Sequence, residues 1–80
     1  MKLKTGSVVA AEAGRDRGGL FAVIGIDGDR CLIADGKSRK LKSPKRKNIK
    51  HIRLTNSMID LNDITDKRLR NELRKLSGSE

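Results

Sequence analysis

The side chains that most often carry catalysis or bind metals are scarce in this chain. It contains one histidine, His51, and one cysteine, Cys31, in 80 residues. A nucleophile, a base and an orienting acid cannot be assembled from this pair at a recognisable spacing, and a four-ligand zinc site would need several carboxylates in addition. Asp60, Asp63 and Asp66 lack the ligand and glycine spacing of a calcium loop. We therefore expect no enzymatic activity, no metal and no cofactor.

Cationic side chains are abundant instead, and they are unevenly placed. The net charge is +9, and residues 1–36 and 54–80 each balance their acidic and basic side chains. The whole excess therefore lies in residues 37–53, the basic segment, which contains no acidic residue. Repulsion within such a segment falls when a polyanion replaces small counterions. The segment predicts nucleic-acid binding, with an anionic membrane or an acidic protein as alternatives.

Arginine can make bidentate contacts to phosphate, whereas lysine acts as a mobile point charge. The candidate RNA-binding residues of the basic segment are Lys37, Arg39, Lys40, Lys42, Lys45, Arg46, Lys47, Lys50 and Arg53. His51 lies among them and either contacts phosphate or is a surface histidine without a particular role.

A glycine-rich stretch over residues 14–19 is a second candidate. Gly14 and Gly18 let the backbone approach an anion closely, and Arg15 and Arg17 add two cations. The stretch lacks the Gly-Lys-Ser/Thr ending of a nucleotide-binding P-loop. Two interpretations stay open here: a phosphate-binding loop, or a sharp connection between two strands.

Aromatic side chains are nearly absent, since Phe21 is the single one. Proteins that read single strands usually stack bases on aromatic platforms. We therefore expect recognition of folded RNA through its backbone and shape, with duplex DNA as an alternative. Phe21 lies in the most apolar stretch and is expected in the core, as is Cys31.

The elements that must position these cations are short strands. Residues 8–11, 20–26 and 30–34 are apolar and bounded by glycine-containing loops, which is typical of strands. Residues 27–29, Asp-Gly-Asp, predict a tight hairpin turn.

Asp35-Gly36 repeats the turn signal, so a polar fourth strand is predicted over residues 37–42. Pro44 predicts a sheet edge or a loop at that point, because proline cannot donate to a ladder. Residues 51–54 alternate polar and apolar and predict a half-buried closing strand. Four or five short strands favour a mainly β fold, a small barrel or sandwich, over a helical bundle.

The periodicity changes after Ile64. Leu69, Leu73 and Leu76 recur at helical spacing, with Thr65 as the predicted N-cap and Ile64 and Leu69 as a hydrophobic staple. A helix of about twelve residues is marginal alone, so its leucines must pack on the barrel or on a partner. This defines a second functional hypothesis, a protein-interaction or dimerisation module that uses the leucine stripe.

The glycine-rich stretch and its flanks resemble the KOW motif, with Gly14 at the hallmark glycine. The similar residues are 6–9, 13–18 and 20–23, followed by 27–30, 32–36, 44–48 and 51–52. Arg17 stands where the motif usually has lysine, and a third motif glycine is replaced around Leu20. The longer pattern covers residues 5–56 and is similar to bacterial KOW-domain RNA-binding proteins related to an archaeal and eukaryotic large-subunit ribosomal protein.

This resemblance implies an SH3-like (KOW) barrel over residues 1–56, structured RNA as the partner, ribosomal RNA or the ribosome above all, and no catalysis. A transcription-associated KOW domain is a further alternative. Residues 57–76, a linker and the helix, carry no function inherited from the resemblance, and residues 77–80 are expected to be a flexible tail.

No apolar run reaches the length of a signal peptide or a membrane span. The lone cysteine cannot form an internal disulfide. We therefore expect a soluble, cytoplasmic protein with no membrane partner.

Overall fold

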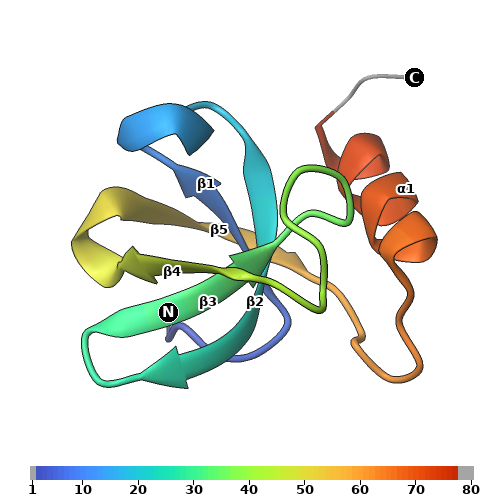
Figure 1. Cartoon of the computed structure of the whole chain (residues 1–80), viewed down its shortest axis with the longest axis horizontal. Coiled ribbons are helices and arrows are strands. Elements are labelled where there is room, and N and C mark those ends of the chain that lie inside the picture. The colour runs from blue at the N-terminus through green and yellow to red at the C-terminus, as the bar shows by residue number, and fades with distance from the viewer. Residues whose placement is uncertain (1, 78–80) are drawn as a thin grey trace.

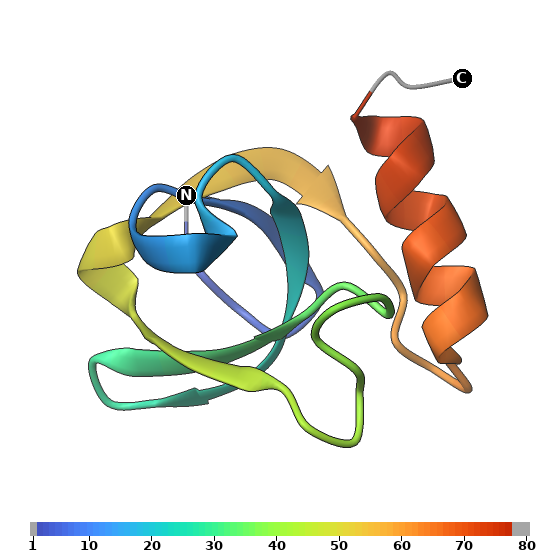
Figure 2. The same cartoon turned by 45° about the horizontal axis from the view of Figure 1, so that its top comes forward.

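The computed structural model describes residues 2–77 and contains a five-stranded antiparallel sheet followed by a helix. The strands are β1 (Ser7–Ala11), β2 (Leu20–Asp27), β3 (Arg30–Ala34), β4 (Lys45–Asn48) and β5 (Ile52–Met58), and the helix is α1 (Asp66–Leu76). Two 3₁₀ helices, η1 (Gly14–Asp16) and η2 (Ile49–His51), join β1 to β2 and β4 to β5. The spatial order is β4-β3-β2-β1-β5, and the sheet curls on itself with α1 outside it (Figures 1 and 2). The predicted mainly β, barrel-like fold with a C-terminal helix is confirmed.

Two local features shape the curled sheet. Asp27 pairs with Arg30 across a tight turn, which Gly28 accommodates with a φ of 62°. The register of β2 against β3 shifts between Val23 and Gly25, and such a bulge bends and twists the strand. A bend of this kind helps a small sheet close into a barrel.

Inside the curl lies the first hydrophobic cluster, which we call the inner core. Its buried members are Val9, Ala11, Phe21, Val23, Cys31 and Ile33, with Leu3, Ile49, Ile52 and Leu54 packed against them. Phe21 and Cys31 are therefore core residues, as predicted.

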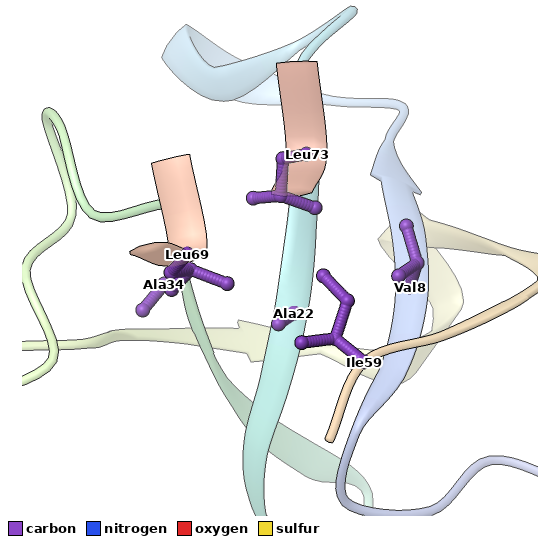
Figure 3. Packing of buried hydrophobic residues seen from close by; sticks show 6 residues of the cluster. All are labelled: Val8, Ala22, Ala34, Ile59, Leu69 and Leu73. Carbon is purple, nitrogen blue, oxygen red and sulfur yellow. The ribbon is translucent and has the colours of Figure 1, made fainter. Parts of the chain in front are cut away.

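Alternate residues of the same strands face the helix and form the outer core (Figure 3). Its buried members are Val8, Ala22, Ala34, Ile59, Leu69 and Leu73. Because the sheet contributes mainly small side chains here, α1 can approach it closely. Leu69 is fully buried and Leu73 is 5% exposed, whereas Leu76 is 44% exposed. The leucine stripe thus packs mostly on its own sheet, which leaves little of it for a partner.

The start of α1 is built as its sequence predicts. The Thr65 hydroxyl accepts a hydrogen bond from the backbone N–H of Arg68 at 3.2 Å. This N–H group lies in the first turn, where the helix itself offers no acceptor. Ile64 packs against the same outer core that contains Leu69.

The strand predicted over residues 37–42 is wrong. The Asp35 carboxylate accepts hydrogen bonds from the backbone N–H groups of Lys37 and Arg39 at 2.9 and 2.8 Å and from the Ser38 hydroxyl at 3.2 Å. These local bonds compete with ladder formation and fold the chain into a loop. The fourth strand starts later, at Lys45, and lies at the sheet edge. Pro44 precedes it in the loop, as predicted.

The predicted boundary after residue 56 lies within β5, which continues to Met58. Ile59 then joins the outer core, so the connection to α1 is itself packed. Of the predicted tail, Ser77 is described and follows the helix directly, and residues 78–80 lie outside the described part of the chain.

Candidate nucleic-acid interface

The few apolar side chains of the basic segment pack against the two hydrophobic cores. The segment runs from the loop beside α1 through β4 and η2 into β5 (Figure 2). Leu41 packs against the outer core, and Ile49 and Ile52 pack against the inner core. Since both ends of the segment are anchored, its cations are displayed from a folded surface rather than from a loose tail.

Most of the candidate cations are exposed and carry no acidic partner. Within residues 2–77, the exposed candidates that form no ion pair are Arg17, Lys37, Lys40, Lys42, Lys45 and Lys50. In this part of the chain, no acidic partner neutralises these charges, so they add up to a positive potential on this surface.

Two further arginines pair weakly with acids at the surface. An Arg46 guanidinium nitrogen lies 3.8 Å from a carboxylate oxygen of Asp27, and the Nε atom of Arg53 lies 3.3 Å from Glu12. All four side chains are at least half exposed, with side-chain exposures from 52% to 82%. Exposed pairs of this kind contribute about 0–1 kcal/mol. A phosphate can therefore compete for either arginine at little cost.

Arg39 and Lys47 are held by a buried acid instead. The Asp16 carboxylate accepts bidentate hydrogen bonds from Arg39 at 3.2 and 3.1 Å and lies 3.7 Å from the Lys47 ammonium. That ammonium also donates to the Ala13 carbonyl at 2.8 Å. The side chains of Asp16 and Lys47 are only 8% and 9% exposed. Lys47 therefore positions the β1–β2 loop, and its nearly buried ammonium offers little of its charge for the predicted RNA contact.

Three of the six backbone amides of the glycine-rich stretch already donate internal hydrogen bonds. The N–H groups of Arg17, Gly18 and Gly19 donate to the carbonyls of Gly14, Ala11 and Asp16 at 3.2, 2.9 and 3.1 Å. These amides are not free to cradle an anion, which favours the interpretation as a sharp connection between strands. Gly14 has a φ of 77°, and a Cβ there would lie 3.4 Å from the Lys47 ammonium, so this glycine serves the fold.

The cations of the loop contribute to the surface in different ways. Arg17 is exposed, while the Arg15 side chain lies outside the described part of the structure. Arg17 and Arg53 line one shallow hollow of about 510 Å³ together with Glu12, Gly18 and neighbouring residues. The fold thus brings a loop cation and a β5 cation together, although they are far apart in the sequence.

The helix holds the start of the basic segment in place, a role that the sequence did not reveal. The Asp66 carboxylate accepts a hydrogen bond from the Leu41 N–H at 2.8 Å, and Arg70 donates to the Gly36 carbonyl at 3.0 Å. Gly36 has a φ of 75°, and a Cβ there would collide with the Asp66 carbonyl. The loop therefore sits directly on the N-terminal half of α1.

The remaining reactive groups do not assemble into a chemical site. Burial raises the pKa of the Cys31 thiol, which keeps it protonated and weakly nucleophilic at neutral pH. His51 is exposed. Within residues 2–77, no three acids, histidines or cysteines are grouped so that they could hold a metal ion.

No protein-family model matches the chain, and a search of curated proteins found no match. Among the described residues, no helix has both the length and the apolar character needed to cross a membrane.

Proposed function

We propose that this protein is an RNA-binding module that docks on structured RNA, ribosomal RNA in the first place, through contacts to the phosphate backbone. The observation that carries the proposal is the basic segment. It contains the whole net charge of +9, and its exposed lysines are displayed from a folded surface. Phosphate contacts of this kind position a protein on a nucleic acid without reading its sequence.

The resemblance of residues 5–56 to KOW-domain RNA-binding proteins supports the same conclusion. The barrel-like fold agrees with it, and Phe21, the single aromatic residue, is 3% exposed. With no aromatic platform on the surface, stacking on splayed bases has no support. Recognition of folded RNA through its backbone and shape is the best explanation of the exposed cations in the basic segment.

Binding to a membrane is supported less well. Peripheral membrane binding usually combines cations with apolar side chains that enter the bilayer. Here the apolar residues of the basic segment, Leu41, Ile49 and Ile52, are committed to the two cores. Among residues 2–77, the large exposed hydrophobic residues are Ile26, Met58 and Leu76, and none of them belongs to the basic segment.

The test is a competition experiment with the full chain. A fluorescently labelled RNA hairpin is titrated with the protein, and unlabelled RNA hairpin, duplex DNA of the same sequence or phosphatidylserine vesicles are added as competitors. We expect RNA to compete best, and we expect the protein to sediment with large ribosomal subunits. No binding to the hairpin at low salt, or stronger competition by DNA or vesicles, would refute the proposal.

A further inference from the structure

A second hollow, of about 400 Å³, lies between the glycine-rich stretch, the loop after β3 and the C-terminal half of α1. Leu73, which Figure 3 shows above β2, and the half-buried Leu20 supply its apolar part. Lys37, Arg70 and Arg74 supply its cationic part. The helix therefore contributes two cations to a surface that the sequence assigned to the barrel alone.

The charge balance of this hollow favours an anionic occupant. Among residues 2–77, Asp35 is the one acidic residue that lines it, and both of its carboxylate oxygens already accept hydrogen bonds from residues of its own loop. Arg70 uses one nitrogen on the Gly36 carbonyl, and Arg74 uses one on the Asn71 side chain at 2.9 Å. A guanidinium has five N–H donors, so both arginines keep donors for a ligand.

The hollow is also continuous with the surface proposed above. The hollow that contains Arg17 and Arg53 shares Gly18 and Leu20 with it. A Cβ at Gly18 would have no neighbour within 4 Å among the described residues, so there is open space on that side of the backbone at a residue that both hollows share. A ligand chain can therefore pass over this glycine from one group of cations to the other.

We propose that an RNA backbone crosses Gly18 and that the hollow against α1 binds one of its phosphodiester groups. Lys37, Arg70 and Arg74 contact the phosphate oxygens, and the ribose lies against the half-buried Leu20. This proposal rests on the proposed function and extends it, because it makes α1 a part of the RNA-binding surface. Arg70 also supports the loop at Gly36, so the contacts of Arg74 and Lys37 are the ones to test.

The experiment compares two double variants that lose the same charge. Lys37→Gln with Arg74→Gln removes two cations of the hollow. Lys42→Gln with Arg68→Gln is the matched control, because it also removes one exposed cation of the basic segment and one of α1, and neither residue lines the hollow. Each variant is titrated against the labelled RNA hairpin over a range of salt concentrations, and thermal melts check that both are folded.

We expect the hollow variant to bind about tenfold more weakly than the control at 0.1 M salt, with a salt slope smaller by about one, as loss of one phosphate contact requires. Equal affinities and slopes for the two variants, with normal binding by the unmodified protein, would overturn this inference and leave the proposed function intact. Failure of the unmodified protein to bind the hairpin would instead refute the proposed function. A variant that loses binding to polyglutamate but keeps RNA binding would assign the hollow to an acidic protein, which also overturns the inference.

Discussion

Replacing Lys40, Lys42 and Lys45 together with alanine should weaken RNA binding in a salt-dependent way without unfolding the protein. All of these side chains are exposed and form no ion pair among the described residues. Their removal therefore breaks no ion pair, and the free energy of unfolding should change by less than about 0.5 kcal/mol.

The magnitude follows from counterion release. If the exposed, unpaired cations neutralise about six phosphates, the slope of log affinity against log salt is about −5. Losing about three contacts reduces it to about −3, which corresponds to a loss of roughly 10²- to 10³-fold in affinity at 0.1 M salt. The two lines should converge near 1 M salt, where counterion release no longer favours binding.

Fluorescence anisotropy with the labelled RNA hairpin at several salt concentrations measures both quantities. The matched control replaces Lys2, Lys4 and Lys67, which are exposed lysines outside the basic segment, and it should keep the steeper slope. Parallel lines for the two triple variants would show that total charge, and not the basic segment, determines binding, and the reasoning would then be refuted.

Three further predictions concern stability and use urea or thermal unfolding. Asp16→Ala leaves the buried Lys47 ammonium without its acidic partner. This should lower the free energy of unfolding by about 3 kcal/mol and the Tm by more than about 10 °C. A change in the free energy of unfolding below about 1 kcal/mol would show that the buried pair is dispensable. Gly36→Ala forces a Cβ into the helix carbonyl at a positive φ and should cost about 3 kcal/mol, whereas an unchanged midpoint would contradict the close packing of this loop on α1. Leu69→Ala should lower the free energy of unfolding by about 3 kcal/mol because it opens a cavity in the outer core. Leu76→Ala, at an exposed position, should change it by less than about 0.5 kcal/mol. Equal effects of the two substitutions would contradict the packing of α1 on the sheet through Leu69.

Much of the fold could be predicted from the sequence because its signals are local. The apolar runs gave β1 to β3, the Asp-Gly pair gave the turn at Gly28, and Thr65 marked the start of α1. The wrong strand over residues 37–42 has a local cause too. Asp-Gly at 35–36 indicates a hairpin, yet the Asp35 side chain bonds to the amides that a strand would have used.

The candidate site was predictable in its charge and not in its contacts. Counting residues located the exposed cations, but no local pattern pairs Asp16 with Arg39, 23 residues away, or with Lys47. The cations of α1 were missed because residues 54–80 are neutral overall. Arg70 and Arg74 are four residues apart, which places them on one face of the helix. The packing of α1 on the sheet brings this face next to Gly18, Leu20 and Lys37, and this packing could not be predicted from the sequence.

Because inner and outer cores lie on opposite sides of β1, this strand has no polar face to fix its alignment. Sliding it by one residue would exchange Val8 and Val9, and each would still enter an apolar layer, so hydrophobicity alone barely distinguishes the two pairings. Gly6 resolves the ambiguity: its φ of 92° and the Ile59 carbonyl, 2.7 Å from where a Cβ would lie, admit no larger residue. A single glycine before β1 therefore helps to fix the alignment of β1.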